Sequence, residues 1–469
     1  MRVLFVSYEV YPLAKVGGLA DVAGSLPKAL KELGLDIDVL MPFHGSVQNR
    51  GIENTGRTVK TRFVKKEYEF ELHRTKLPSS EVDLYLLKNN ELMNAPEVYN
   101  VSDLGLQAMA FSDAASVFAS EGGYDLVHLN DWHTGLMAVY LDQIGKPIRT
   151  LISVHNLAYQ GVYPENYLRI SGIERDRWGM VSSGDNINCL KAGLIASDMI
   201  NTVSPTYARE IQTSEYGAGL DGVLRERKDD LIGILNGIDS TEYDPAKDRH
   251  LWVNFDSKNV EGKAINKGHL QDFVGLPRTD NAVIGLISRL VDQKGLDLIA
   301  AIKEDLMELP LQLIVLGTGE KKYEGMFERL QVECPDKIAA KITFNLDLAQ
   351  KIYGGCDMFL MPSRYEPCGL GQLFAMRYGT VPVVRLTGGL ADTVKEFDPS
   401  SFEGNGFGFY DYSPEELLET LKKAIKAYED QRTWSRIVSN AMEEDFSWKA
   451  SARNYLAVYE KILEVKGDA

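Results

Sequence analysis

Short apolar runs alternate with longer segments of helical periodicity along the first half of the chain. Such runs predict buried strands, and loops that carry Gly, His or Asp follow them. The predicted strands of this series are Val3–Val6, Asp38–Met41, Leu126–Leu129 and Thr150–Val154. Alternation of strands with helices is typical of a parallel sheet that helices cover.

A second series of the same kind begins after residue 280. Its predicted strands are Ala282–Ser288, Leu311–Leu316, Ile342–Phe344, Met358–Met361 and Val381–Val384. The chain is therefore expected to be an α/β protein with two doubly wound, Rossmann-like domains that meet near Asn236–Pro245. Because ligands bind at the carboxyl ends of strands in such sheets, we expect the active site in a deep cleft between two facing domains.

Length, charge and cysteine content exclude several classes of protein. A chain of 469 residues exceeds the size of one ordinary hydrophobic core, and its net charge of −16 argues against a nucleic-acid partner. The four cysteines form no CxxC pair, which predicts neither a zinc site nor a disulfide framework and indicates a reducing compartment. No signal peptide and no run of about 20 apolar residues is found, so the prediction is a cytoplasmic protein without a membrane partner.

A glycine-rich turn follows the first predicted strand. Lys15, Gly17 and Gly18 precede a predicted helix, where backbone N–H groups and a cation suit a diphosphate or a sugar. A tight turn with a surface lysine is the alternative. A dinucleotide fingerprint is disfavoured because the spacing does not fit GxGxxG. Asp36-Ile37-Asp38 resembles a DxD metal clamp, but its position at the start of a strand favours a structural role.

Polar side chains follow two more strands of the first series. Asp131 and His133 come after Leu126–Leu129, and His155 comes after Thr150–Val154. Groups of this kind at one edge of a sheet bind sugar hydroxyls or position a reacting centre, although a single histidine there is more often structural.

Two cations follow the first strand of the second series. Arg289 ends that strand and Lys294 lies in the next turn. A departing nucleoside diphosphate gains negative charge in the transition state, which fixed cations stabilise. An ordinary exposed pair is the alternative, and only the position at the switch point of the sheet argues against it.

The densest motif lies between the predicted strand Met358–Met361 and a predicted helix over Leu373–Tyr378. Here Glu366 offers a carboxylate for sugar hydroxyls, and Gly369 to Gly371 free backbone N–H groups for phosphate. A structural turn with a solvent-facing glutamate is the alternative. The loop with Thr387 and Gly388 makes a similar, weaker case for donor binding.

At this point the chain resembles the bacterial glycogen synthase and plant starch synthase family. The motifs that carry the resemblance run from residue 15 to residue 448 and cover nearly the whole chain: Lys15 to Leu19, Asp131 to His133, His155 to Gly161, Thr202 to Tyr207, Gly219 to Gly222, Asn236 to Asp239, Arg289 with Lys294, Pro362 to Leu370, Thr387 to Leu390, and Phe446 to Trp448.

The resemblance implies the GT-B glycosyltransferase fold. It implies an N-terminal domain over residues 1–240, completed by a C-terminal helix over 450–469, and a nucleotide-sugar-binding domain over 241–449. It further implies retaining transfer of glucose from ADP-glucose to an α-1,4-glucan or maltooligosaccharide acceptor, without a metal or another cofactor. UDP-glucose as the donor, and a related transferase with another acceptor, stay open.

The resemblance also implies roles for individual residues. Arg289 and Lys294 match residues that neutralise the diphosphate, and Glu366 matches one that binds the donor sugar. Asp131 and His155 match residues that line the glucose and acceptor site. The remaining matches belong to the donor-binding site: Lys15, Gly17, Gly18, Asp21, Asn236, Cys368, Gly369, Leu370, Gly371, Thr387 and Gly388.

The mechanism expected from these residues is front-side attack assisted by the leaving phosphate. Cations for phosphate are present, while no carboxylate stands out as a covalent nucleophile. A glucan-binding protein without catalysis is the alternative from another class, but it would not need Arg289, Lys294 and Glu366 together. A glucan phosphorylase is disfavoured because no pyridoxal-binding lysine motif is evident.

Overall fold

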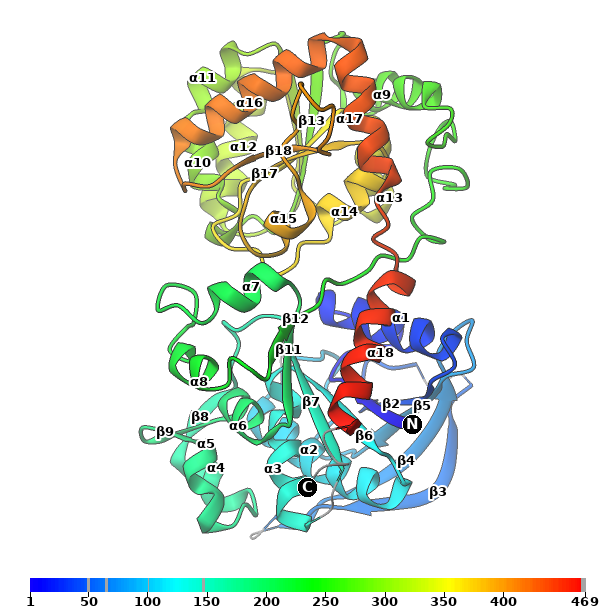
Figure 1. The fold of residues 1–469 in the computed structure, drawn as a ribbon, viewed down its shortest axis with the longest axis vertical. Helices are drawn as coiled ribbons and strands as arrows, with labels where there is room; N and C mark the ends of the chain where they lie inside the picture. The colour runs from blue at the N-terminus through cyan, green and yellow to red at the C-terminus, as the bar shows by residue number, and fades with distance from the viewer. Residues whose placement is uncertain (49–50, 64–65, 100, 146–147, 465–469) are drawn as a thin grey trace. The chain divides into compact units, whose positions relative to one another are not determined.

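The computed structural model describes residues 1–48, 51–63, 66–99, 101–145 and 148–464. The chain divides into two compact units. Unit 1 comprises Met1–Gly237 with Trp448–Ala469, and unit 2 comprises Ile238–Ser447. Each contains a large sheet with helices packed against it (Figure 1).

The described part of unit 1 contains a nine-stranded sheet with the order β12-β11-β7-β6-β1-β2-β5-β4-β3. The strands are β1 (Arg2–Val6), β2 (Asp36–Pro42), β3 (Glu53–Lys60), β4 (Glu69–Lys76), β5 (Asp83–Lys88), β6 (Leu126–Asn130), β7 (Arg149–Val154), β11 (Met199–Thr202) and β12 (Leu231–Gly233). The four strands predicted from the apolar runs are confirmed, and all pair in parallel. These strands form a central parallel sheet with its switch point between β1 and β6.

The edge formed by β3, β4 and β5 was not predicted. These strands pair antiparallel and make the sheet mixed. β3 is exposed along most of its length, and β4 alternates buried and exposed positions, so neither produces a continuous apolar run. The side chain of Asp38 in β2 accepts hydrogen bonds from Arg2 (3.0 Å) and from the Tyr124 hydroxyl (2.9 Å). The Asp36-Ile37-Asp38 segment thus serves the packing of the sheet, as its position at the start of a strand predicts.

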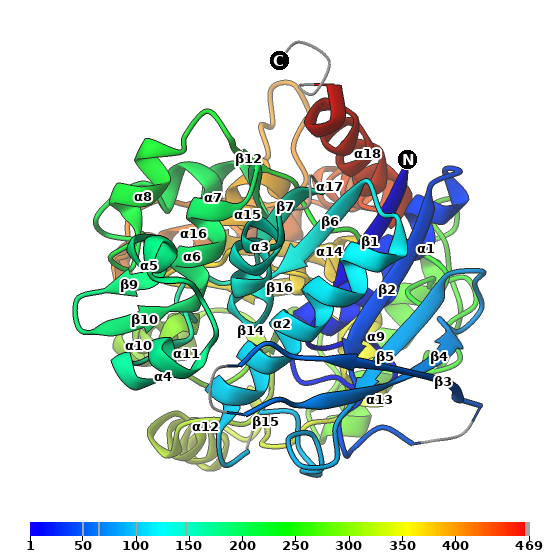
Figure 2. The same cartoon turned by 90° about the horizontal axis from the view of Figure 1, so that it is seen from below.

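Helices and a small second sheet complete the described part of unit 1. The helices are α1 (Gly18–Glu32), α2 (Leu104–Gly122), α3 (Trp132–Ile144), α4 (Glu165–Ile170), α5 (Trp178–Val181), α6 (Cys189–Ala196), α7 (Pro205–Glu210), α8 (Asp221–Glu226) and α18 (Trp448–Glu464), with a 3-10 turn at Arg175–Arg177. The small sheet has the order β8-β10-β9, from Val162–Pro164, Asn186–Asn188 and Ser182–Ser183. α1 packs against α18, whereas α3 packs against both α2 and α6 (Figure 2).

α18 follows unit 2 in the sequence but packs in unit 1, where buried polar groups fix it. The Tyr459 hydroxyl lies 2.7 Å from Nδ1 of His128 in β6, and the other ring nitrogen lies 2.7 Å from the Ser153 hydroxyl in β7. Asn201 in β11 donates to Ser153 (2.8 Å) and to the Tyr455 hydroxyl (3.0 Å). Burial lowers the pKa of His128 well below its ordinary value, so the ring is neutral. Three strands and the last helix are thereby joined.

Unit 2 contains a six-stranded, all-parallel sheet with the order β15-β14-β13-β16-β17-β18. The strands are β13 (Ala282–Ile287), β14 (Leu311–Leu316), β15 (Ile338–Lys341), β16 (Met358–Met361), β17 (Val381–Arg385) and β18 (Phe407–Phe409). In chain order this is 3-2-1-4-5-6, the Rossmann arrangement, with its switch point between β13 and β16.

The predicted strand Ile342–Phe344 is wrong. β15 ends at Lys341, after Ile338 to Lys341 have paired with β14. Both residues lie past the strand: Ile342 is half-buried and packs against the edge of the core, and Phe344 is 79% exposed. Apolar character alone misplaced the strand because Ala339 and Ala340, which do pair, contribute little hydrophobicity.

The helices described in unit 2 are α9 (Glu261–Val274), α10 (Leu296–Ala301), α11 (Lys303–Glu308), α12 (Lys321–Glu333), α13 (Leu346–Gly355), α14 (Gly371–Arg377), α15 (Gly388–Thr393), α16 (Pro414–Glu429) and α17 (Gln431–Glu443), with a 3-10 turn at Asp292–Lys294. The helix predicted over Leu373–Tyr378 is α14, which begins two residues earlier. Among the described residues of the whole chain, no helix is both long and apolar enough to cross a membrane.

The contact between Tyr459 and His128 predicts a measurable stability effect. Replacing Tyr459 with Phe leaves Nδ1 of a buried histidine without its partner, which costs about 1–3 kcal/mol. Denaturant unfolding of the variant should show this loss in free energy. Tyr159→Phe is the matched control, since Tyr159 is 57% exposed in the same unit, and it should change stability by less than about 0.5 kcal/mol. Equal stabilities of the two variants would contradict a role for this contact.

Candidate functional site

The predicted site residues of unit 1 lie at the carboxyl ends of parallel strands of one sheet. The loop from Lys15 to Asp21 follows β1, Asp131 follows β6, His155 follows β7, and Asn236 comes shortly after β12. Because β1 and β6 flank the switch point, the sheet gathers the loop and Asp131 at the position where doubly wound sheets bind ligands.

Asp131 is held in a constrained conformation. Its φ is 57°, a left-handed value that is costly for a residue other than glycine, by about 1–3 kcal/mol. Its carboxylate accepts a hydrogen bond from the backbone N–H of His155 (2.7 Å), and its own N–H donates to the Ser153 carbonyl (2.9 Å). Burial raises the pKa of Asp131 to about 7, so both protonation states are populated at neutral pH.

The hydrogen-bond network determines the tautomer of His155. Asn130 donates through Nδ2 to the Val6 carbonyl (3.0 Å), which leaves its Oδ1 as an acceptor. Nε2 of His155 lies 2.9 Å from that oxygen and therefore carries the proton. Burial lowers the pKa of His155 to about 4, so the ring is neutral at physiological pH and Nδ1 is an acceptor. His155 offers hydrogen bonds to a substrate but no positive charge.

His133 is placed differently from its two neighbours in the motif. Its buried ring stacks between Trp132 (3.9 Å between ring centroids) and Tyr8 (4.6 Å), and burial lowers its pKa to about 3. The ring is packed among aromatic side chains, and among the described residues its buried Nδ1 has no hydrogen-bond partner.

The loop before α1 is held by its own ion pair and by a buried carboxylate. Lys15 Nζ lies 2.6 Å from a carboxylate oxygen of Asp21. Glu9, which the sequence reasoning did not single out, accepts hydrogen bonds from the N–H groups of Val16 and Gly17. The N–H of Gly17 is therefore already bonded within the protein, and the assignment of Gly17 to the donor site stays a prediction. In the described chain, the N–H of Gly18 has no acceptor and its Cα faces open space.

Asn236 carries a second unsatisfied group. Its side chain is buried, and among the described residues its Oδ1 has no hydrogen-bond partner. Buried polar atoms of native proteins are normally paired, so an orphaned oxygen marks a position that a ligand can satisfy.

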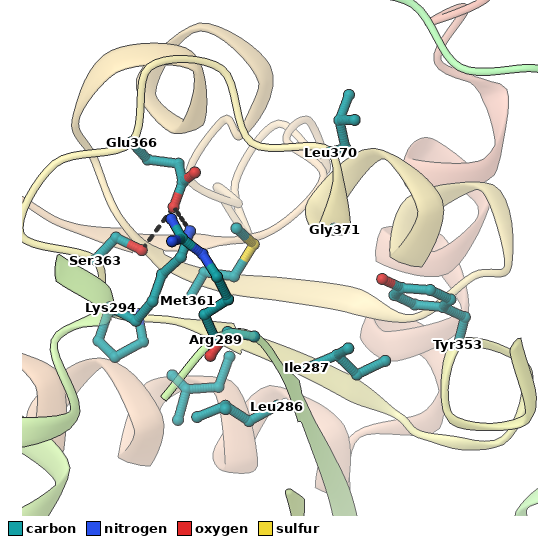
Figure 3. Close-up of a pocket in the computed structure, with 13 residues that line it drawn as sticks. Leu286, Ile287, Arg289, Lys294, Tyr353, Met361, Ser363, Glu366, Leu370 and Gly371 are labelled. Atoms are coloured by element: carbon teal, nitrogen blue, oxygen red, sulfur yellow. Dashed lines mark hydrogen bonds and ion pairs between the residues drawn. The ribbon is translucent and has the colours of Figure 1, made fainter. Parts of the chain in front are cut away.

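In unit 2 a pocket of about 270 Å³ lies at the switch point between β13 and β16. It is lined by Leu286, Ile287, Ser288, Arg289, Lys294, Tyr353, Leu360, Met361, Pro362, Ser363, Glu366, Leu370 and Gly371 (Figure 3). Apolar strand residues form part of the wall, and charged side chains gather at one end. Ser288, Tyr353 and Ser363 are lining residues that sequence reasoning missed.

An ion pair forms the polar end of this pocket. Lys294 Nζ lies 2.6 Å from Oε2 of Glu366, and the Ser363 hydroxyl donates to the same oxygen (2.9 Å). Both charged side chains are mostly buried, at 17% and 9% exposure. The side chain of Arg289 extends to the same end (Figure 3), and its guanidinium makes no hydrogen bond or ion pair with the described residues. One cation is thus oriented by a carboxylate, while a second is left for a ligand.

Two glycines bring the loops of this site together. Gly295, with φ of 69°, lies so close to the Pro362 carbonyl that a Cβ would stand 1.9 Å from its oxygen. Gly388, with φ of 47°, lies equally close to the Glu366 carbonyl, and the next N–H, that of Gly389, donates to it (3.1 Å). Any larger residue at either glycine would push the loops apart. Gly388 and Gly389 therefore support the main chain of Glu366, and Thr387 directly precedes them.

The loop before α14 contributes backbone groups. Leu370 and Gly371 line the pocket, whereas Cys368 is buried beneath it and Gly369 adopts a left-handed φ of 70°. The N–H groups of Gly369, Leu370 and Gly371 have no acceptor within the described residues. Cys368, Gly369, Thr387 and Gly388 are thus predicted site residues that do not line the pocket itself. Among the described side chains, no group of three or more His, Cys, Asp or Glu is placed to hold a metal ion.

Comparison with known proteins agrees with this geometry. Residues 2–226 match the starch synthase catalytic domain family, and residues 270–440 match the glycosyl transferases group 1 family. The glycogen synthase of Kosmotoga olearia is 55% identical over 99% of this chain and 98% of its own, and that of Thermotoga maritima is 49% identical over the full length of both.

Two solved structures resemble the chain. The catalytic domain of starch synthase IV from Arabidopsis thaliana, bound to ADP and acarbose, superposes with a TM-score of 0.90 at 31% identity and covers 99% of each chain. A sucrose-phosphate synthase from Thermosynechococcus elongatus, at 18% identity and a TM-score of 0.62, shares the fold.

Two Rossmann-like units, with polar residues gathered at the switch points of their sheets, define a glycosyltransferase of the GT-B fold class. Within that class, the chain belongs to the glycogen synthase and starch synthase family. It is a glucosyltransferase that takes glucose from a nucleotide sugar and adds it to a glucan.

The different surroundings of Gly17 and Gly18 predict different sensitivities. A Cβ at Gly18 would project into open space where a ligand approaches, so Gly18→Ala should lower kcat/KM for the sugar nucleotide by about 10-fold or more without changing stability. Gly17 has an extended backbone and the nearest atom to a Cβ there is 3.9 Å away, so Gly17→Ala should have a smaller effect. Steady-state kinetics and thermal unfolding of both variants test this. Equal losses would show that the two glycines have the same role.

The ion pair in unit 2 yields another prediction. Lys294→Ala or Arg289→Ala should lower turnover by about 100-fold or more, the scale of losing one preorganised electrostatic contact. Lys303→Ala, at an exposed lysine of the same unit, is the control and should leave turnover unchanged. Kinetics close to wild type for the Lys294 variant would remove that residue from the site.

Proposed function

We propose that the chain transfers glucose from ADP-glucose to the non-reducing end of an α-1,4-glucan, with retention at the anomeric carbon and without a metal ion. The observation that carries the proposal is the polar end of the unit 2 pocket, where Lys294 is paired with Glu366 and Arg289 is left without a partner among the described residues. That arrangement suits a diphosphate beside a sugar.

Arg289 and Lys294 act on the leaving group. As the bond between glucose and phosphate breaks, negative charge grows on the diphosphate, and cations already fixed in place stabilise it without reorganisation. Glu366 holds the Lys294 ammonium before the donor arrives, and the Ser363 hydroxyl donates to the same carboxylate oxygen. The free N–H groups of Gly369, Leu370 and Gly371 add donors for the phosphate oxygens.

Glu366 has a second role at the donor sugar. A carboxylate accepts about four hydrogen bonds, and the described contacts of Glu366 use only one of its two oxygens, Oε2. Its other oxygen is available to the hydroxyl groups of glucose. The neighbouring Gly388 and Gly389 keep the main chain of this residue in place.

The residues of unit 1 act on the glucose and the acceptor. His155 is neutral and offers a hydrogen-bond acceptor at Nδ1, and Asp131 offers a carboxyl group that exists in both protonation states near pH 7. Lys15, Asp21, Gly18 and Asn236 are the donor-binding residues that unit 1 contributes. Neither Asp131 nor Glu366 is assigned as a nucleophile. The acceptor hydroxyl attacks from the face that the phosphate leaves, and a phosphate oxygen takes its proton.

The choice of ADP-glucose over UDP-glucose is supported by the starch synthase from Arabidopsis thaliana, which was solved with ADP and which covers 99% of this chain. Curated relatives named glycogen synthase support the glucan acceptor.

Chain extension of a maltooligosaccharide tests the donor. We expect kcat/KM with ADP-glucose to exceed that with UDP-glucose by about 10-fold or more, because a base-specific contact discriminates on this scale. Extension with UDP-glucose alone would overturn the donor assignment, and no extension with either nucleotide would point to another acceptor. NMR of the new linkage should show the α-anomer.

Metal removal tests the mechanism. Activity should survive exhaustive treatment with a chelator, because fixed cations and backbone N–H groups take the charge that a divalent ion would neutralise elsewhere. An apo-enzyme that is inactive and regains activity with Mg²⁺ or Mn²⁺ would contradict this account. A trapped glucosyl ester on a carboxylate would contradict front-side attack.

A further inference from the structure

Glu9 is a buried carboxylate directly after the central strand of unit 1. Its side chain is 2% exposed, and the strand before it, β1, flanks the switch point of the sheet. One carboxylate oxygen accepts the N–H groups of Val16 (2.5 Å) and Gly17 (2.9 Å), and the other accepts the Tyr99 hydroxyl. The carboxylate thus meets three donors from two separate segments.

The contacts of Glu9 fix the main chain where it enters α1, at Gly17 in the N-cap position and at Val16 before it. α1 begins at Gly18, and Gly17 at its N-cap position has no side chain with which to satisfy the first N–H groups. The rest of the loop is held by the mutual backbone hydrogen bonds of Val10 and Ala14 and by the ion pair of Lys15 with Asp21. Glu9 binds the main chain at Val16 and Gly17, which lie between the Val10–Ala14 hydrogen bonds and the start of α1.

This binding determines which way the N–H groups of the loop point. Those of Val16 and Gly17 are turned toward the buried carboxylate. The next one, that of Gly18, has no acceptor among the described residues. Without Glu9, two further N–H groups would compete for the same ligand and the loop would lose its fixed orientation.

The third contact connects the loop to the other side of the switch point. Tyr99 stacks on His133 (5.2 Å between ring centroids), and His133 stacks on Trp132, the residue after Asp131. The charge of Glu9 also contributes to the raised pKa of Asp131, after burial as the main cause. One carboxylate therefore contacts the donor loop and adjoins the segment that carries Asp131.

We infer that Glu9 is a positioning residue for the sugar-nucleotide donor, because it orients the loop from Lys15 to Gly18 and leaves the Gly18 N–H and the Lys15 ammonium to bind the donor. Glu9 acts through the loop and does not touch the donor. The inference rests on the proposed donor site, since it assigns the purpose of the loop geometry.

Kinetics of three Glu9 variants separate this role from simple structural support. Glu9→Ala should raise KM for ADP-glucose and lower kcat/KM for it by about 10- to 100-fold, the cost of misplacing a binding group by about 1 Å. KM for the maltooligosaccharide should stay within about twofold of wild type. Glu9→Gln keeps an oxygen for the two N–H groups and an amide that can donate to the Tyr99 oxygen, so it should restore most of the activity. Glu9→Asp is too short to reach the loop and should resemble Glu9→Ala.

Hydrogen exchange provides a readout that does not depend on turnover. The amides of Val16 and Gly17 should exchange slowly in wild type and in Glu9→Gln, and faster in Glu9→Ala, while amides of β6 and β7 stay protected in all three. Glu53→Ala, at an exposed glutamate of the same unit, is the matched control for both measurements. Tyr99→Phe removes only the third contact and should leave exchange at Val16 and Gly17 unchanged.

The outcomes distinguish this inference from the proposed function. If wild type extends a glucan and Glu9→Ala loses loop protection but keeps its KM for ADP-glucose, the positioning role is refuted. A loss of kcat with both KM values unchanged, or equal losses in Glu9→Gln and Glu9→Ala, would also refute it. If wild type uses no sugar nucleotide, the proposed donor is refuted. The contact between Glu9 and the loop is still tested in that case, by comparing amide exchange at Val16 and Gly17 in wild type and Glu9→Ala.

Discussion

Parallel pairing of strands places their carboxyl ends along one edge of a sheet, and both units of this glucosyltransferase depend on that constraint. In unit 1 it aligns the loop after β1 with Asp131 after β6, and in unit 2 it aligns Lys294 after β13 with Glu366 after β16. In each unit these two strands flank the switch point, where the connections that follow them run in opposite directions. The loops therefore diverge and leave room for a ligand between them. The same topology therefore produces two sites of different chemistry.

The chemistry differs because the two edges carry different charges. The pocket of unit 2 contains cations, one of them preoriented by a carboxylate, which suits a diphosphate. At the edge of unit 1, burial keeps His155 neutral and allows Asp131 to be protonated near pH 7, which suits hydroxyl groups that exchange hydrogen bonds with a sugar. Glu9 differs from both, as a buried carboxylate that accepts hydrogen bonds from two N–H groups of the loop it holds and from the Tyr99 hydroxyl.

Close backbone contacts limit which residues this arrangement tolerates. Gly295 and Gly388 allow their loops to lie against the main chain of Pro362 and Glu366, at distances that no side chain permits. The Lys294 and Glu366 contact depends on these approaches, because each residue lies directly beside one of the glycine contacts. The positions of the Lys294 and Glu366 side chains in unit 2 therefore depend on glycine at positions 295 and 388.

The sequence by itself determined the two α/β units, the central parallel strands and most of the polar residues at their ends, because buried parallel strands produce unbroken apolar runs that glycine loops follow. It misplaced β15, whose alanines are weakly hydrophobic, and missed the amphipathic edge strands β3 to β5. Only the tertiary structure decided that Gly17 and Gly18 differ, that Glu9 holds their loop, and that Ser363 and Lys294 both bond to the same oxygen of Glu366. These contacts join residues that are distant in the sequence. The order of residue types does not specify the direction in which a backbone N–H group points.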